Sequence, residues 1–483
     1  MSLTGALSAA TSGLSAASRS AQLVSSNVAN ALTEGYGRRD IRLSSLGAGG
    51  AGGGVQVTGV DRVVDQYAIG QRRLASANFG QANQLADLYS IVSTVVGTPD
   101  DPTSLSARVA AFENSLISAT ASPESATTLD AAVTAARGIV SFFHSASDVV
   151  QETRESSDQQ IHQQVQLLNV NLSAISDLNT QIRSQISSNW DPSPLMDERQ
   201  RLIDEISEIV PLREIPGEYG RISLLTENGT ILVGDHAATF EFEPTLTIVP
   251  EMTVQSGALS GLTLVGAESS VGSALEAISG GALAANFAIR DEATIELQEK
   301  LDALAQNLIT RTSDATVDPT LGAGPGIFTD QGLAIDPANV TGIAARIQIN
   351  SEIDPLQGGA SWKLRDGVGA TTQGPSGNIS ILSSIADALR AAPAGGSPSS
   401  PETASFASLA AGFESHVGTV RIQSETKATY ASSQVSTFSE IEGRLGVDTD
   451  QEMQKLLVIE QSYAANAKII QAVDEMMQSL LRI

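Results

Sequence analysis

The sequence predicts a mainly α-helical fold with β-rich parts. Apolar residues repeat with heptad spacing at both ends of the chain, stripes with helical spacing fill much of the middle, and stretches with short β-like runs lie between them. A chain of 483 residues exceeds one ordinary core, so several domains are expected. We therefore predict that the N- and C-terminal helices form an α-helical coiled coil. A long helical-bundle domain with a β-hairpin and a small β-rich outer domain complete the predicted fold.

The first predicted element is a helix at the start of the chain. Its apolar positions are spaced alternately four and three residues apart, like the a/d seam of a coiled coil. These positions are Leu3, Leu7, Ala10, Leu14, Ala17, Ala21, Val24 and Val28. Alanine is frequent among them, so a partner helix could approach closely. We expect the helix to end near Asn30–Thr33, with Gly35 as a left-handed stop.

A glycine-rich stretch at residues 47–54 follows. Its glycines formally match the GxGxxG pattern of dinucleotide sites, which requires a strand before it and a helix after it. Here Val55, Val57 and Val60 indicate a strand after it, so we interpret the stretch as a flexible linker.

Residues 72–210 have the spacing of long helices. The clearest stripe, which Asn179 interrupts, comprises Ile161, Val165, Leu168, Leu172, Ile175, Ile182 and Ile186. A charged amphipathic helix is predicted at 195–209. Its carboxylates, such as Asp197 and Asp204, lie beside Arg199 and Arg201, and we interpret them as a salt-bridged helix face rather than an acid/base pair.

The period of the pattern changes near 220–250. Two short strand-like runs flank Asn228-Gly229, which is a strong signal for a β-hairpin. Leu297, Leu301, Leu304 and Leu308 then indicate another helix. Residues 321–401 are rich in Gly, Pro, Ser and Asp with short β-like runs such as 345–349, and we predict a small β-rich outer domain with an exit linker at 392–401.

The last segment is again a heptad helix, after a helix at about 406–441 that glycines at 443 and 446 end. Its seam is Leu456, Ile459, Tyr463, Asn466, Ile470, Val473, Met477 and Leu480. Two matched seams favour terminal helices that pair with each other or with neighbouring subunits, and the alternative is ordinary docking on a core. We predict a terminal domain of 1–45 with 445–483, a helical domain of 46–320 with 402–444, and the outer domain at 321–401.

Composition and motifs exclude several classes of function. The formal charge is 28 − 54 = −26, which repels phosphate backbones, so neither nucleic acid nor an anionic membrane is an expected partner. The absence of cysteine excludes disulfides and thiolate chemistry. The four histidines have no metal-site spacing, and no phosphate-binding loop or nucleophile elbow is present. We expect no enzyme activity, cofactor or metal, no membrane-spanning segment and no cleaved secretory signal.

The segment that follows the first heptad helix resembles a signature of bacterial flagellar rod, hook and hook-associated proteins. Its matching residues are Asn27, Asn30, Thr33, Gly35, Tyr36 and Arg38. Residues 461–477 resemble the closing helix of the same superfamily. Residues 195–207 and 280–305 are similar to two stretches of the hook-associated protein 1 family, whose members form the first hook–filament junction. The resemblance spans most of the chain outside about 320–400.

This resemblance implies a structural subunit of the flagellum that joins hook to filament. It implies export through the flagellar type III apparatus, assembly at the hook tip, and a location at the junction outside the cell. Implied partners are further copies in a ring, the hook protein, the second hook–filament junction protein, and an export chaperone at the C-terminal helix. A cytosolic helical scaffold and another flagellar axial subunit, of hook or rod, stay open as alternatives. The first would not explain the paired heptads or the Thr33–Arg38 motif.

Overall fold

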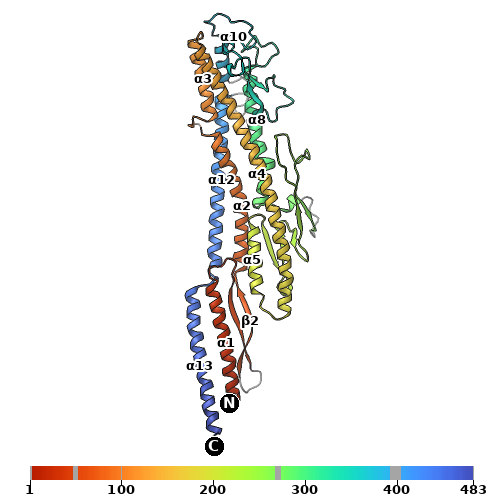
Figure 1. Ribbon diagram of the computed structural model, residues 1–483, viewed down its shortest axis with the longest axis vertical. Helices are drawn as coiled ribbons and strands as arrows, with labels where there is room; N and C mark the ends of the chain where they lie inside the picture. The colour runs from red at the N-terminus through yellow and green to blue at the C-terminus, as the bar shows by residue number, and fades with distance from the viewer. Residues whose placement is uncertain (1–2, 47–52, 99, 267–273, 392–403, 482–483) are drawn as a thin grey trace.

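The computed structural model describes residues 3–46, 53–98, 100–266, 274–391 and 404–481. The molecule is elongated, and both ends of the chain lie at the same end of its long axis (Figure 1). We call the part nearest the termini the terminal unit and the remainder the body. The terminal unit comprises α1 (Leu3–Ala29), β1 (Arg38–Leu46), β2 (Gly54–Val63) and α13 (Thr449–Leu481).

The terminal unit is an antiparallel helix pair beside a two-stranded ribbon. Gly13 on α1 faces Asn466 on α13, and Asn27 bonds to Glu452, so one helix runs up as the other runs down. The strands β1 and β2 pair antiparallel, with an irregularity between Arg42 and Leu43. The predicted helix and its end are confirmed, since α1 stops at Ala29 and Gly35 has φ of 76°. Most of the predicted glycine linker lies outside the described residues.

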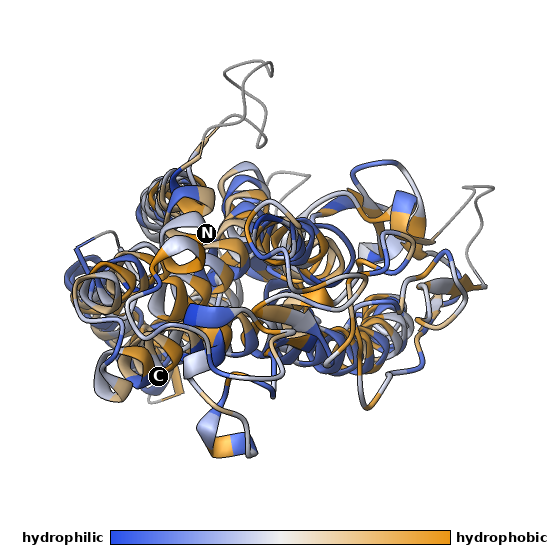
Figure 2. Ribbon diagram, turned by 90° about the horizontal axis from the view of Figure 1, so that it is seen from above, coloured by the Kyte–Doolittle hydropathy of each residue, from blue (hydrophilic) through white to orange (hydrophobic). Residues whose placement is uncertain are grey.

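The body is built on long helices that run along the same axis. Its helices in chain order are α2 (Gln66–Val96), α3 (Leu105–Ala121), α4 (Ala126–Ser187), α5 (Ser193–Ser207), α6 (Ala274–Ala277), α7 (Gly281–Ala288), the π-helical η2 (Ile289–Ala293), α8 (Thr294–Thr312), α9 (Ile343–Arg346), α10 (Trp362–Asp366), α11 (Ser380–Arg390) and α12 (Phe406–Gly443), with 3-10 turns η1 (Glu218–Gly220) and η3 (Pro355–Gln357). Helices α2 and α12 pack together, and a view along the axis shows the helices end-on as a bundle (Figure 2). Together with the packing of α1 on α13, this confirms the mainly helical prediction.

Two apolar clusters hold the body together. The distal cluster joins α3, the first half of α4, α8 and the start of α12 around Phe112, Phe143 and Phe406. The proximal cluster joins the second half of α4 to α5 and the small strands. The predicted stripe on α4 supplies its core, including Ile161, Leu168 and Leu172.

Short antiparallel strands cover the second half of α4. A three-stranded sheet consists of β3 (Leu212–Pro216), β4 (Ile222–Thr226) and β5 (Ile231–Val233), and β6 (Thr239–Glu241) pairs with β7 (Thr263–Val265). The predicted hairpin is β4–β5, and Gly229 in its turn has φ of 85°, a conformation that glycine adopts without strain. Asn179, the polar interruption of the α4 stripe, exchanges hydrogen bonds of 2.9 and 3.2 Å with the backbone of Ile222. It therefore anchors this sheet to α4.

The segment predicted to be β-rich is mainly helix and loop in its described part. Between 321 and 391 it has only the three-residue strands β8 (Phe328–Asp330) and β9 (Ile347–Ile349), and α9, α10 and α11 contain more residues. The prediction was wrong because Gly and Pro here end short helices. Residues such as Phe328 and Leu382 belong to the distal cluster, so the segment shares a core with the long helices. The predicted exit linker lies outside the described residues. Within the described residues, every helix is either too short or too polar to span a membrane.

Candidate assembly site at the terminal helices and the joint

The terminal helix pair buries only part of its apolar surface. On the predicted N-terminal seam Val24 is buried, Leu3, Leu14 and Val28 are half-buried, and Leu7 is exposed. On the predicted C-terminal seam Val473 is buried, Leu456, Ile459 and Ile470 are half-buried, and Tyr463, Met477 and Leu480 are exposed. Leu457 and Val458, off the seam, are 58% and 65% exposed. The α1–α13 contact therefore leaves apolar side chains of α13 uncovered.

A glycine lets the two helices approach closely at mid-length. A Cβ atom built on Gly13 would lie 2.8 Å from the side chain of Asn466, the one polar residue of the C-terminal heptad. Such a contact is shorter than van der Waals packing permits. Gly13 and Asn466 thus act as a matched pair in the seam.

Asn27 of the signature is the central polar residue of the terminal unit. It is fully buried, and its Oδ1 accepts hydrogen bonds from the Tyr36 hydroxyl at 2.9 Å and the Arg39 N–H at 3.0 Å. Its Nδ2 donates to the Arg39 carbonyl and to Oε2 of Glu452, both at 2.9 Å. Asn27 therefore ties α1, β1 and α13 together at one point. The other oxygen of Glu452, Oε1, accepts a hydrogen bond of 2.7 Å from the Lys455 ammonium group.

The other signature residues shape the turn between α1 and β1. Asn30 donates back to the Ser26 carbonyl at 2.9 Å, and the Thr33 hydroxyl donates to Asn30 at 3.3 Å. The Tyr36 ring lies 4.9 Å from the guanidinium carbon of Arg39. Arg38 begins β1 and faces Asp40 at 3.5 Å.

The two signature glycines allow the turn to dock closely. Gly35 has positive φ, and a Cβ on it would lie 3.3 Å from the carbonyl of Asp197 on α5. A Cβ on Gly37 would lie 2.5 Å from Nε of Arg62. A side chain at Gly35 would be strained by the positive φ and would crowd the Asp197 carbonyl, and one at Gly37 would have to displace the Arg62 side chain.

One carboxylate on α5 receives three donors from the terminal unit. Asp197 accepts from the Gly37 N–H at 3.0 Å, the Arg39 guanidinium at 2.8 Å and the Arg62 guanidinium at 2.6 Å. The three charged side chains are only 10 to 14% exposed. Arg62 also bonds to Gln200 and to the Gly35 carbonyl. We call Asp197 with these three donors the Asp197 clamp.

A second charged group lies about two helical turns further along α5, around Asp204, and belongs to the body. Asp204 pairs with Arg72 at 2.7 Å and with Arg73 at 2.6 Å, and Arg72 also reaches Glu442 on α12 at 2.6 Å. Arg73 completes the group by pairing with Glu214 on β3 at 2.8 Å. Burial opposes the charge of Arg72, but Asp204 and Glu442 outweigh it and raise its pKa above the ordinary value.

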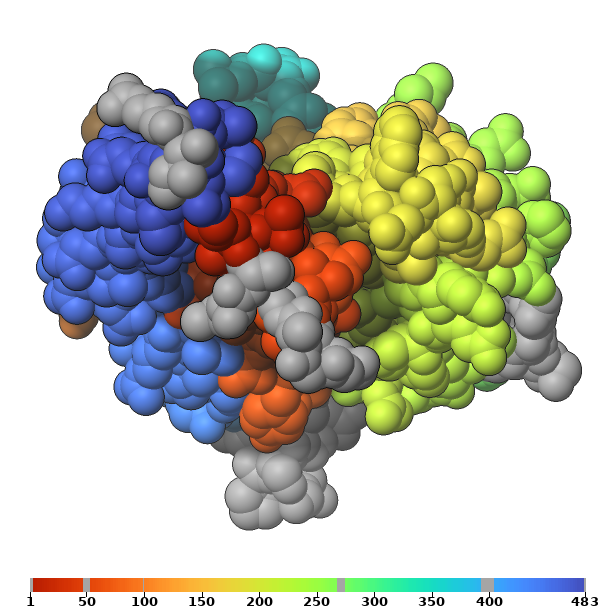
Figure 3. All heavy atoms as spheres, turned by 90° about the horizontal axis from the view of Figure 1, so that it is seen from below, coloured from red at the N-terminus to blue at the C-terminus, as the bar shows by residue number. Residues whose placement is uncertain are grey.

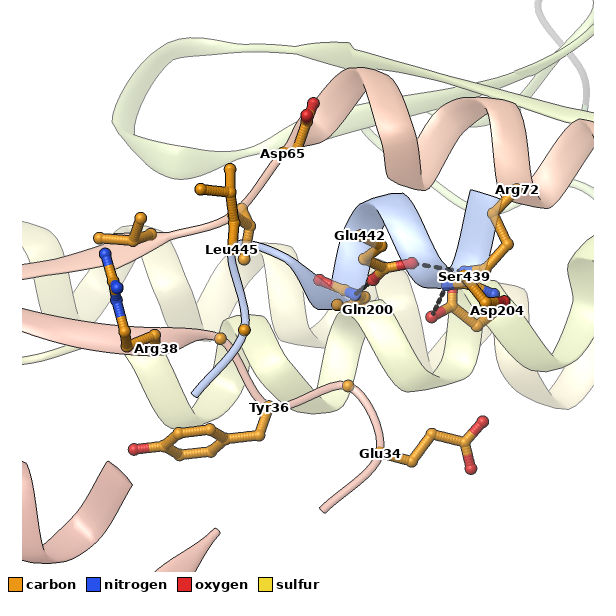
Figure 4. A pocket seen from close by; sticks show the side chains of 16 residues that line it. Glu34, Tyr36, Arg38, Asp65, Arg72, Gln200, Asp204, Ser439, Glu442 and Leu445 are labelled. Carbon is orange, nitrogen blue, oxygen red and sulfur yellow. Dashed lines mark hydrogen bonds and ion pairs between the residues drawn. The ribbon is translucent and has the colours of Figure 1, made fainter. Parts of the chain in front are cut away.

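The second group and Gly37 of the clamp border a cavity of about 310 Å³ at the joint between terminal unit and body. Glu34, Tyr36 and Arg38 line it from the turn, and Arg72, Asp204 and Glu442 line the opposite wall. Figure 4 shows Arg72 with Asp204 and Glu442 on one side and the Tyr36 turn on the other. The joint is thus a polar contact of several elements far apart in sequence.

The sequence prediction for α5 was correct only for its outer face. Arg201 pairs with Glu198 and Glu205 on the exposed surface, as expected of i, i+3 and i, i+4 neighbours. Asp197 and Asp204 instead pair with distant arginines. The signal that could have found them is the spacing of Asp197, Gln200 and Asp204, three and four residues apart, which places these polar side chains on one side of the helix.

Little else in the described residues points to chemistry on a substrate. No group of His, Asp and Glu among them could hold a metal ion. His144 hydrogen-bonds to the Ile347 carbonyl at 2.7 Å, and His162 contacts Gln166 at 2.7 Å, as part of helix packing. Fold and site together define a class of protein: an elongated, mainly helical chain with paired terminal helices and a charged joint.

Comparisons with known proteins show which flagellar families the chain resembles. The helical-domain model of flagellar hook-associated protein FlgK matches residues 91–316, and the C-terminal model of flagellar basal body rod FlgEFG proteins matches 443–483. The longer match, over the helical part of the body, makes the chain similar to the flagellar hook-associated protein 1 (FlgK) family. The matched ranges include α5 and the C-terminal helix, which confirms the resemblance there, whereas the signature at 27–38 lies outside both ranges. The family is a structural one.

Similar proteins come from several bacteria. Flagellar hook-associated protein 1 of Salmonella typhimurium strain LT2 is 29% identical over 279 residues, covering 52% of this chain and 50% of that protein. The protein of the same name from Bacillus subtilis strain 168 is 28% identical over 236 residues, covering 46% of each. The chain spans about half the length of the curated relatives it matches. The solved flagellar hook junction protein FlgK from Burkholderia pseudomallei is 20% identical, with a TM-score of 0.43, over 54% of this chain and 46% of that one.

Proposed function

We propose that this chain is a structural subunit of the bacterial flagellum that joins the hook to the filament and catalyses no reaction. The observation that carries the proposal is the match of residues 91–316 to the helical domain of hook-associated protein FlgK, on a chain whose ends pair as helices. A junction must be held on both sides by protein contacts, and a long helical body with a pair of terminal helices at one end suits that mechanical task.

Assembly would use the terminal helices. Seen from the terminal end, α1 and α13 lie side by side and α13 faces outward (Figure 3). Its uncovered apolar residues, such as Leu457, Val458 and Leu480, would be buried against neighbouring copies in a ring. The hook protein and the second hook–filament junction protein are the proposed partners on either side. The terminal unit would form the inner wall of a tube, with the helical body around it and the 321–401 segment outward.

Export would precede assembly. We propose passage through the flagellar type III apparatus as an unfolded chain, with which the absence of cysteine and the 4% aromatic content agree. Before export, a chaperone would cover the apolar side of α13 between Leu456 and Leu480, which would otherwise self-associate. The final location would be the hook–filament junction outside the cell.

Another axial subunit, of hook or rod, is the nearest alternative, because residues 443–483 match a rod-protein model. That model accounts for the last helix alone, whereas the helical-domain match covers most of the body up to α8. The longer match therefore favours the junction over the hook or rod.

The test is electron microscopy of flagella from a strain that lacks this chain. The proposal predicts hooks without filaments, and complementation with the chain restores filaments. Loss of the hook itself would assign the chain to the rod or hook instead. Normal filaments in the deletion strain would contradict a flagellar junction function.

A further inference from the structure

The terminal unit is covalently joined to the body at only two places. The chain passes from β2 to α2 through 64–65, and from α12 to α13 through 444–448. Two short connections allow rotation about the line that joins them, as in the hinges of domain closure. A third contact that lies off this line restricts the rotation.

The Asp197 clamp supplies this third contact. Asp197 belongs to the body, because the other side of α5 is packed into the proximal cluster through Leu202, Ile203 and Ile206. All three of its donors belong to the segment from the α1–β1 turn to β2. Hydrogen bonds between charged groups are stronger than neutral ones, and partial burial protects them from screening by salt.

The ribbon itself contains a sign that it is built to bind this carboxylate. Arg39 and Arg62 are directly opposite each other in the β1–β2 register, so their charges lie on one face of a two-stranded ribbon. Like charges in this position are destabilising on their own. Asp197 accepts from both, at 2.8 and 2.6 Å, and offsets the repulsion. The repulsion between the two arginines of the ribbon is therefore offset only when the ribbon is docked on α5.

We infer that Asp197 is a positioning residue that fixes the orientation of the terminal unit on the body. In an assembly it sets the direction from which the paired terminal helices enter the wall. This second part rests on the proposed function, whereas the first concerns the isolated chain and is tested without flagella.

The experiment measures distances between paired spin labels in the full chain by pulsed electron paramagnetic resonance. The natural chain has no cysteine, so two introduced cysteines are the only labelling sites. One pair crosses the joint, from the exposed Ser184 on α4 to the exposed Gln461 on α13. A second pair, Ser8 on α1 with Gln461, reports the fold of the terminal unit alone. Both pairs are measured with and without Asp197→Ala, and with Glu198→Gln as the matched control.

We expect Asp197→Ala to broaden or shift the distance distribution of the cross-joint pair and to leave that of the terminal pair unchanged. Glu198→Gln removes only the surface pair with Arg201 and should change neither. An unchanged cross-joint distribution in Asp197→Ala would overturn the inference. Broadening of both pairs would overturn it as well, because Asp197 would then be needed for folding of the terminal unit rather than for its orientation.

Discussion

Replacement of Asn27 by alanine tests whether the signature asparagine holds the terminal unit together. The change leaves the N–H and C=O of Arg39 and one oxygen of Glu452 without their partner, while Tyr36 lies near enough to the surface to bond water. Each buried polar group left unpaired costs about 1–3 kcal/mol. The groups share one site and their costs are not additive, so we expect a loss of about 3 kcal/mol.

This loss should affect the terminal unit and spare the body. The buried apolar residues of the terminal unit are only Ala10, Ala16, Ala17, Val24 and Val473 among those described, so its own stability is small. A loss of about 3 kcal/mol corresponds to amide exchange more than about a hundredfold faster. Hydrogen exchange read by mass spectrometry should show this in α1, β1 and α13, with α3 and α4 unchanged.

The control for this prediction is Asn30→Ala. Asn30 belongs to the same signature, but its amide bonds only within its own turn, where it donates to the Ser26 carbonyl and accepts from the Thr33 hydroxyl. We expect a loss below about 1 kcal/mol, the ordinary value of one part-exposed hydrogen bond. If Asn27→Ala and Asn30→Ala accelerate exchange equally, the four bonds of Asn27 do not hold the three elements together and the reasoning is refuted.

Three further predictions concern other contacts. Ile470→Asp places a carboxylate on the half-buried side of α13 and should abolish incorporation at the hook tip without changing the melting of the body. Gln471→Asp, on the exposed side, should leave incorporation intact. Electron microscopy and a separate secretion assay check this, and normal incorporation of Ile470→Asp would contradict the assignment of Ile470 to the assembly seam. Gly13→Val should force α1 away from α13 and lower the stability of the terminal unit by about 1–3 kcal/mol. Limited proteolysis should then cleave both helices faster than in the unaltered chain. Equal rates of cleavage in the two proteins would show that the close approach is dispensable. Arg290→Met should destabilise the body by about 3–5 kcal/mol, measured by urea unfolding. The substitution leaves the fully buried carboxylate of Asp158 without its cation, whose Nη1 lies 2.6 Å from Asp158 Oδ1. A change below about 1 kcal/mol would contradict this prediction.

The sequence predicted those elements in which apolar residues recur with a regular period. Heptad spacing predicted α1 and α13, and the stripe from Ile161 to Ile182 predicted the buried side of α4, because burial along a helix follows the helical period. Asn228-Gly229 predicted the β4–β5 hairpin because few residue pairs adopt its turn. These inferences depend on neighbours in sequence.

Contacts between distant segments could not be predicted in this way. No local pattern joins Asp197 to Arg39 and Arg62, which lie more than 130 positions away. Of the short helices between 321 and 391, α9 and α10 escaped prediction because four and five residues are too few to show a helical period. The sequence analysis missed α11, although Ile381, Ile385 and Leu389 repeat with helical spacing. The division into terminal, helical and outer domains remains a proposal, and so does the role of each seam residue in assembly.

Electron cryomicroscopy of intact flagella at the hook–filament boundary tests the central claim most directly. The account predicts a ring of subunits between hook and filament, in which density for the antiparallel pair α1–α13 lines the inner wall and the α2–α12 body lies outside it. An inner wall at that boundary without this helix pair would contradict the account.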